Sequence, residues 1–464
     1  KIAVEDSLKL ACSIGTDSSF YDKVSYTLQV KDTTVHEQLY TTELILPGET
    51  RTIQSKEKDA SIAFFPSTNA FLDNLRQQLA GYRYGCVEQT SSKLLALVYE
   101  ARLCKLTERS FSKGAEVDQM VKRLIELKND KGLWGWWNGQ ETDWWMVAYA
   151  TRALLIAQEE GFETYGSTIK PLDVLTKFVE SSAKVYPMLE LLFLEHGIAY
   201  SSHTPHYTEG DFSVLEQLQL LRIRQLKGAT NLTEDVMQLA TEIQDQLLWG
   251  DATYRMEDHV STTSLCALEI LFYEMQFKDW YNTFMMPFLT TDNLGNGKYN
   301  TLEMARIIGL MANVHHYSGS ILVNGKAWEH GANEIHLRTN EVVKLENTSP
   351  FATMIVLPSE LDEEASQQQQ SFFTLSSRLK KGGVYTDSLR MGDNAIIEVE
   401  LYCMEEQEKL MLEVPFPAGC TPLPFSDGGS ALHHRTFNDA VSIFCGHLSR
   451  GRHVFHVPVR ASYQ

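Results

Sequence analysis

The sequence Tyr82-Arg83-Tyr84-Gly85-Cys86-Val87-Glu88-Gln89-Thr90-Ser91-Ser92 runs directly into an apolar stretch that begins at Lys93. Apolar residues recur there at helical spacing, so Cys86 and Gln89 stand at the start of a predicted helix. Residues three apart on a helix share one face. The thiol of Cys86 and the carboxamide of Gln89 are therefore expected to meet, and the N–H groups and dipole of the helix start are expected to favour a thiolate.

A thiolate beside a primary carboxamide can displace ammonia and close an internal thioester. Thiols have a pKa of about 8.5, so a thiolate leaves readily when an amine or hydroxyl attacks the acyl group of Gln89. The ordinary alternative is a buried Cys and an exposed Gln on a helix, and an isolated Cys-x-x-Gln would favour it. The full Gly-Cys-x-Glu-Gln motif, which includes Glu88, arises by chance in a chain of this length on the order of once in a thousand.

Water destroys a thioester slowly, so such a bond has to be kept dry. Tyr82 and Tyr84 flank the motif and can shield it. Gly85 leaves room for the backbone to turn into the helix.

Around this motif, residues from about 67 to 313 follow a helical period. Two of the predicted helices, 144–157 and 265–272, are apolar nearly all round and must be enclosed on several sides, as in the inner ring of a layered helical array. Helical spacing also predicts a helix that carries Val236, Leu239, Ala240, Ile243 and Leu247. The other predicted helices cover residues 117–127, 143–158, 211–226, 263–274 and 302–312.

The residues on both sides of the helical block alternate between apolar and polar, as β-strands do. Residues 1–66 form the first such segment and residues 314–359 the second, in which Val323-Asn324-Gly325-Lys326 predicts a type I′ hairpin. An acidic, Gln-rich linker is expected at 360–370, and a last strand-rich block at 371–464. The simplest topology is a helical domain inserted into a β domain whose two halves pair.

Composition limits the possible functions of this chain. Its 464 residues are enough for two to four domains, and 43% hydrophobic and 22% charged residues are typical of globular proteins. The 41 Lys and Arg against 60 Asp and Glu give a net charge of −19, which argues against nucleic-acid binding. No apolar run is long enough to cross a bilayer. The start at Lys1 is interpreted as a cut from a longer chain, so any anchor or targeting signal is expected upstream.

The seven cysteines form no Cys-x-x-Cys pair, and no His stands at zinc-finger spacing. We expect no metal and no cofactor. Cys104 and Cys266 fall on apolar helix faces, where a buried thiol that packs as a small hydrophobe is the better interpretation.

In its motifs the sequence resembles the alpha-2-macroglobulin and complement thioester family, particularly its bacterial members. The family signature Gly-Cys-x-Glu-Gln, often preceded by Tyr, matches residues 84–89. The Gly-Trp stretch 132–137 with the following 143–149, the helix 301–312 and the tail 433–461 are also similar to the family. Val87 and Thr90 stand where animal members usually carry Gly and Asn.

The resemblance implies a multidomain α and β fold. Residues 67–313 would be the thioester domain, an α/α toroid, inserted between the segments 1–66 and 314–359 of a CUB-like β domain. Residues 371–464 would be a C-terminal macroglobulin-like β-sandwich. By the same resemblance Cys86 and Gln89 form the thioester, Tyr82 helps to shield it, and Gly85 and Glu88 belong to the motif.

The resemblance also implies a function, namely a fragment of a broad-spectrum protease inhibitor. The thioester would acylate lysine amines of target proteases once, without turnover, in the periplasm or outside the cell. A histidine that relays the acyl group to hydroxyls would instead indicate a complement-like surface-tagging or adhesion module. His203, His206 and His259 are in the right block but align with no relay position, so amines are the expected targets. A toroid enzyme of the prenyl-transfer or cyclase kind would need an Asp-x-x-Asp cluster, which the sequence lacks.

Overall fold

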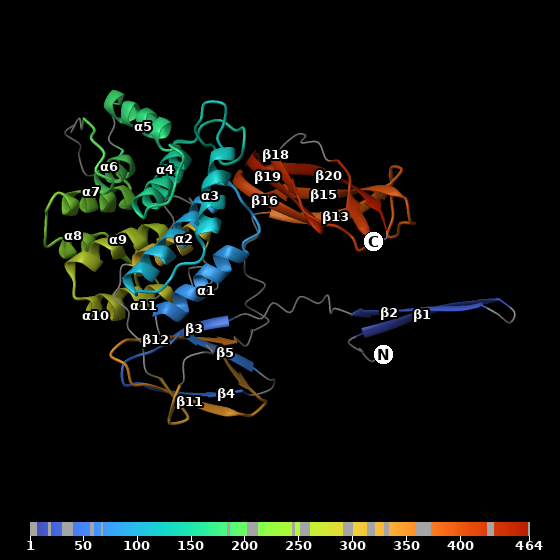
Figure 1. Ribbon diagram of the computed structural model, residues 1–464, viewed down its shortest axis with the longest axis horizontal. Coiled ribbons are helices and arrows are strands. Elements are labelled where there is room, and N and C mark those ends of the chain that lie inside the picture. Colours follow the sequence, from blue (N-terminus) through green and yellow to red (C-terminus); the bar gives the residue numbers. More distant parts are fainter. Residues whose placement is uncertain are drawn as a thin grey trace. The chain divides into compact units, whose positions relative to one another are not determined.

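The structure is a computed structural model of the 464-residue chain. The chain divides into two compact units, Lys1–Glu360 and Leu361–Gln464, and each is described by itself (Figure 1). The predicted linker 360–370 lies outside the described residues. The structure describes residues 7–16, 20–29, 40–55, 60–65, 68–182, 186–201, 212–243, 246–250, 260–290, 300–312, 321–328, 334–358, 373–424 and 431–462.

The helices of the first unit bury a common apolar core. They are α1 Thr68–Gly81, α2 Val87–Leu106, α3 Gly114–Glu126, α4 Trp144–Glu159, α5 Ile169–Ser181, α6 Pro187–Glu195, α7 Val214–Leu226, α8 Thr233–Gln238, α9 Val260–Glu274, α10 Phe277–Trp280, the π-helical turn Tyr281–Met285, α11 Met286–Leu289 and α12 Thr301–Ala312.

Helices α4 and α9 are buried along most of their length, which confirms that helices apolar nearly all round are enclosed. Helix α2 is enclosed as well, and its buried residues include several hydroxyl-bearing ones. Helix α12 approaches it closely at Gly309, where a Cβ atom would lie 2.5 Å from the Tyr99 ring. Cys104 and Cys266 are buried, as predicted.

One predicted helix is wrong. The chain leaves α8 after Gln238 and forms a hairpin of β6 Ala240–Ile243 and β7 Gln246–Trp249. Leu247, expected in the apolar stripe, is 46% exposed, whereas its neighbours Leu248 and Trp249 are buried. The Trp249 indole N–H donates to the Val236 carbonyl at 2.8 Å, so the hairpin buries this large side chain with its polar N–H satisfied.

Strands on both sides of the helical block pair with one another. Their bounds are β3 Tyr40–Ile45, β4 Thr50–Gln54, β5 Ala60–Phe65, β8 Ile321–Val323, β9 Lys326–Ala327, β10 Glu334–Leu337, β11 Val342–Asn347 and β12 Thr353–Pro358. They form two antiparallel four-stranded sheets in the orders β10-β5-β12-β3 and β4-β11-β8-β9. In Figure 1 the helices lie together on one side of these strands.

The two four-stranded sheets share an apolar cluster. One sheet supplies Ile45, Ile62, Leu337 and Ile355, and the other Ile321, Val343 and Leu345. Between β8 and β9, Asn324 and Gly325 both have positive φ, at 51° and 76°, which confirms the predicted type I′ turn. Strands β1 Ser7–Thr16 and β2 Phe20–Gln29 pair only with each other within the described part of the chain.

The second unit is a β-sandwich. Its strands are β13 Phe373–Lys381, β14 Val384–Tyr385, β15 Asn394–Cys403, β16 Gln407–Pro415, β17 Cys420–Pro422, β18 Ala431–Thr436, β19 Ala440–Leu448 and β20 Gly451–Ala461. A five-stranded sheet, β14-β13-β15-β20-β17, and a three-stranded sheet, β16-β19-β18, contribute to one core. Alternate residues of β15 and β20 point into that core, as the period of two predicts.

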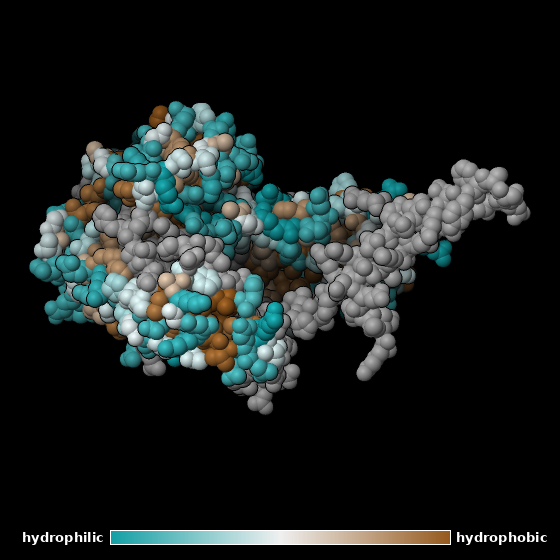
Figure 2. Space-filling model, turned by 60° about the horizontal axis from the view of Figure 1, so that its bottom comes forward, coloured by the Kyte–Doolittle hydropathy of each residue, from teal (hydrophilic) through white to brown (hydrophobic). Residues whose placement is uncertain are grey.

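The surface shown in Figure 2 is mixed, with apolar residues in small groups among hydrophilic ones. In the part of the chain that the structure describes, no helix has the length and apolar character needed to cross a bilayer.

Candidate functional site

Cys86 and Gln89 lie together at the N-terminus of α2. Cys86 is the N-cap, and its sulfur accepts a hydrogen bond from the Gln89 backbone N–H at 3.4 Å. In return the Cys86 N–H donates to Oε1 of Gln89 at 3.0 Å. This reciprocal pattern is a capping box. It holds the sulfur and the carboxamide on the same side of the helix start.

The helix start is dry. Cys86 is 2% exposed, and Val87, Thr90, Ser91 and Ser92 are buried with it. Gln89 is half-buried. A reactive acyl group at Gln89 would therefore be only partly accessible to solvent.

The expected thiolate at Cys86 is wrong for a free thiol in this position. Burial raises the pKa of the Cys86 thiol, and the nearby Glu88 carboxyl raises it further. The N–H groups at the helix start lower this pKa by less than burial raises it. A neutral group, thiol or thioester, is what this environment favours.

Both predicted shielding residues lie beside the helix start. Tyr84 is buried and Tyr82 is half-buried, and their rings meet edge to face with centroids 5.5 Å apart. Burial raises the pKa of the Tyr82 hydroxyl, and the negative charge of nearby Glu88 raises it further. Gly85 lies between Tyr84 and Cys86 and has no left-handed φ.

The ammonium group of Lys93 fixes the segment that carries the two tyrosines. Its Nζ donates to the backbone carbonyls of Tyr82 and, at 3.4 Å, of Tyr84. Lys93 follows the motif directly, but the sequence alone does not indicate this contact. The contact ties residues 82–84 to the second turn of α2.

Glu88 is buried beneath the site rather than exposed at it. Its carboxylate accepts hydrogen bonds from Ser92 at 2.7 Å and from Thr301 of α12 at 2.8 and 2.9 Å. Because Ser92 donates to Glu88, the Tyr149 hydroxyl at 2.9 Å donates to Ser92. Burial raises the pKa of Glu88, and the hydrogen bonds from Ser92 and Thr301 offset only part of this rise. Glu88 thus links α2 to α12.

The Gly-Trp stretch lies against the same helix start. The Trp136 carbonyl accepts a hydrogen bond from the Val87 N–H at 3.2 Å, which satisfies an N–H group that α2 cannot satisfy itself. The turn needs glycine at position 135, where a Cβ atom would lie 2.3 Å from the Glu141 carbonyl oxygen. The indole of Trp136 donates to Asp143, the N-cap of α4.

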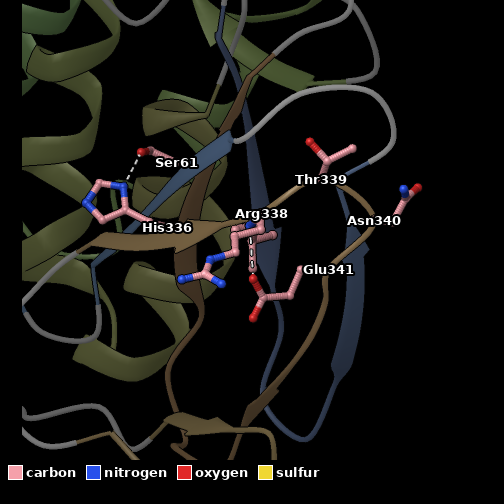
Figure 3. Close-up of a pocket in the computed structure, with 7 residues that line it drawn as sticks. Ser61, His336, Arg338, Thr339, Asn340 and Glu341 are labelled. Atoms are coloured by element: carbon pink, nitrogen blue, oxygen red, sulfur yellow. Dashed lines mark hydrogen bonds between the residues drawn. The ribbon is translucent and has the colours of Figure 1, made fainter.

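A pocket of about 890 Å³ lies on the β sheets of the first unit, around Ser61, His336 and the turn 338–341. Figure 3 shows the Ser61 hydroxyl facing the His336 ring, and the two groups are 2.6 Å apart. Ser61 and His336 stand directly opposite each other on β5 and β10. Strand pairing alone brings such residues together, so this contact indicates no chemistry. His203, His206 and His259 lie outside the described residues.

The fold and the buried Cys–Gln cap define a class of protein, in which a helical block is inserted between paired strands and followed by a β-sandwich. No protein-family profile matches the chain. A curated alpha-2-macroglobulin of Thermotoga maritima is 26% identical over 175 residues, which are 36% of this chain and 11% of the relative. One of Escherichia coli is 36% identical over 93 residues, which are 18% of this chain and 6% of the relative.

Solved structures agree with these matches. The part of Escherichia coli alpha-2-macroglobulin from domain MG7 to the C-terminus superposes with a TM-score of 0.62 at 14% sequence identity. The match covers 99% of this chain and 83% of the solved chain. Salmonella alpha-2-macroglobulin reacted with methylamine superposes with a TM-score of 0.65 at 14% sequence identity, and the match covers 98% of this chain and 33% of the solved chain. At this identity the structures show the fold alone. Together with the curated relatives they confirm the resemblance to bacterial alpha-2-macroglobulins, and the curated matches span about a tenth of those proteins or less.

Proposed function

We propose that this chain is the thioester-bearing part of a protease-trapping protein. The reciprocal capping of Cys86 and Gln89 in a buried helix start is the single observation that carries the proposal. The Cys86 sulfur replaces the amide nitrogen of Gln89, ammonia leaves with the thiol proton, and an uncharged acyl–sulfur bond remains. Such a bond suits a site where burial disfavours a thiolate.

The trapping step is a single acyl transfer. An amine of a protease lysine attacks the Gln89 acyl carbon, an amide forms, and the Cys86 thiol is released. Nothing regenerates the thioester, so the protein acts once and is not a turnover enzyme. The attacking protease would first cut a susceptible segment of the inhibitor and so uncover the site. We place this event in the periplasm or outside the cell.

The same proposal assigns domains. Residues 67–313 would be an α/α toroid, residues 1–66 and 314–359 the halves of a CUB-like domain, and residues 371–464 a macroglobulin-like sandwich. The pairing of β3, β4 and β5 with β10, β11 and β12 supports the insertion. Because β1 and β2 pair only with each other in the described part of the chain, the CUB-like pairing is proposed from Tyr40 onward.

Intact-mass spectrometry of the native chain tests the thioester. The mass should be about 17 Da below the sequence mass, because ammonia is lost on closure. Methylamine, with which the Salmonella relative was reacted, should add to Gln89 and release one alkylatable thiol, identified by peptide mapping as Cys86. Glycerol in place of methylamine tests the hydroxyl-directed alternative.

Cys104 and Cys266 serve as internal controls, because both are buried and neither has a carboxamide partner in the motif. They should stay unlabelled in the native protein before and after methylamine. An unshifted mass together with ready alkylation of Cys86 in the untreated native chain would contradict the thioester.

A further inference from the structure

The helical block contains a cavity that the proposed thioester does not use. Its volume is about 630 Å³, and α4, α6, α7 and α12 supply most of its lining. Small-molecule sites typically enclose about 300–1,000 Å³. Cys86 and Gln89 are not among the lining residues. The cavity therefore offers a binding site separate from the acyl-transfer chemistry.

Stacked aromatic rings form the apolar part of the cavity. Trp144 stacks on Phe178 with ring centroids 4.5 Å apart and planes 18° apart. Trp145 stacks on Tyr149 at 5.1 Å and 19°. Trp144 is 40% exposed, which is unusual for a residue of this size in an otherwise buried helix. Trp145 also stacks on Trp136, at 6.1 Å and 8°, so the partly exposed ring of Trp144 is the one that suits a planar aromatic ligand.

The charged side chains that line the cavity are not all neutralised. Arg152 pairs with Glu195 at 3.1 Å. Glu216 accepts a hydrogen bond from the Ser213 N–H at 2.8 Å and so serves the cap of α7. Arg306 donates to the Thr262 carbonyl at 3.1 Å but forms no ion pair with any carboxylate of the described residues.

Arg306 is therefore the lining cation without a carboxylate partner. A partly buried guanidinium with only a carbonyl acceptor is stabilised by an anion, which forms stronger, charge-assisted hydrogen bonds. The Thr262 hydroxyl, which belongs to a residue that also lines the cavity, is buried and has no hydrogen-bond partner in the described part of the chain. Nε of Arg152 is likewise buried without a hydrogen-bond partner in the described residues, so Arg306, Thr262 and Arg152 all have polar atoms beside the aromatic wall that a ligand could satisfy.

We propose that this cavity binds a small aromatic carboxylate, with the ring against the Trp144 and Trp145 side of the cavity and the carboxylate on Arg306. The proposal does not depend on the thioester. It predicts discrimination between ligands that have the same shape but differ in charge.

Isothermal titration calorimetry with 2-naphthoate and the neutral 2-naphthamide tests it on the full 464-residue chain. The wild type should bind one equivalent of naphthoate, about tenfold more tightly than the amide. Arg306→Gln should bring the two affinities to within about twofold of each other, because only the carboxylate loses a partner. Ala148→Trp and Met188→Trp, which fill the cavity from α4 and α6, should abolish binding of both ligands.

Arg123→Gln is the matched control, since Arg123 lies on the exposed face of α3 and pairs with Glu126. It should leave both affinities unchanged. Circular dichroism shows which variants fold. If one of the two cavity-filling variants does not fold, the other serves in its place. Absence of naphthoate binding, equal binding of the two ligands by the wild type, or an unchanged preference in Arg306→Gln would each overturn the proposal.

Discussion

Two helices of this protein begin with the same hydrogen-bond pattern. At α7 the Glu216 N–H donates to the Ser213 hydroxyl at 3.3 Å, and the Ser213 N–H donates to the Glu216 carboxylate at 2.8 Å. At α2 the corresponding distances, to the Cys86 sulfur and the Gln89 carboxamide, are 3.4 and 3.0 Å. Both are capping boxes, so their backbone geometry is shared.

The two boxes differ in chemistry and in exposure to water. Ser213 is exposed, whereas Cys86 is buried. An ionised carboxylate offers a neighbouring hydroxyl no leaving group to displace, whereas a thiol beside a carboxamide can close an acyl–sulfur bond with loss of ammonia. A common helix cap therefore brings a sulfur and an acyl carbon together, and side-chain identity and burial decide whether a bond forms between them.

Cys86→Ser gives the α2 box the hydroxyl cap of the α7 box, and it has the largest expected effect. Methylamine incorporation at Gln89 should be lost completely, because no thiol can form the thioester. Serine is a good N-cap, so the free energy of unfolding should change by no more than about 1 kcal/mol. Intact mass and urea denaturation measure the two effects. Continued incorporation of methylamine into Gln89 would show that the sulfur is not the activating group.

Thr301→Val tests whether the buried box depends on a neighbouring helix. Glu88 would lose one of its two hydroxyl donors while it stays buried, which costs about 1–3 kcal/mol of unfolding free energy. Urea denaturation should show a lower midpoint with an unchanged slope. A midpoint equal to that of the wild type would mean that Thr301 does not support Glu88.

Ser213→Ala removes the side-chain acceptor of the exposed box. The expected loss is about 1 kcal/mol of unfolding free energy, as for other N-cap serines. The rate of methylamine incorporation at Gln89 should not change. A changed rate would reveal coupling between α7 and the site, which two independent caps would not show.

The double variant Ser213→Cys/Glu216→Gln transfers the reactive residue pair to the exposed helix start, and it should have the smallest effect. No second loss of ammonia is expected, because water reaches this cap. Intact mass should show one deficit of about 17 Da, as in the wild type. A second deficit would show that burial is not required.

The sequence was sufficient to predict the mixed architecture, the buried helices and the meeting of Cys86 with Gln89, because these depend on local spacing. It did not reveal that Lys93 binds the Tyr82 and Tyr84 carbonyls or that Thr301 binds Glu88. The second contact joins residues of α2 and α12 that only the tertiary fold brings together. The roles of Cys86, Gln89, Tyr82 and Tyr84 in acyl chemistry remain predictions.

The errors have physical causes. Helical spacing was wrong at Leu247, because the chain forms a hairpin there that buries Leu248 and Trp249 and leaves Leu247 exposed. The thiolate expected at Cys86 was wrong because the sequence signals a helix dipole but does not report burial, and burial is the larger influence on the thiol pKa.

The pairing of the β strands has a consequence for biosynthesis. In the described residues β3 pairs only with β12, β4 only with β11, and β5 with β10 and β12, so none of the three early strands pairs with another. As the chain leaves the ribosome, these segments have no sheet to join until the whole helical block has been translated. The helices can fold first, because their contacts are local. Until the late strands pair with them, the early strands have unpaired edges that can aggregate, so a chaperone would be most useful at this stage.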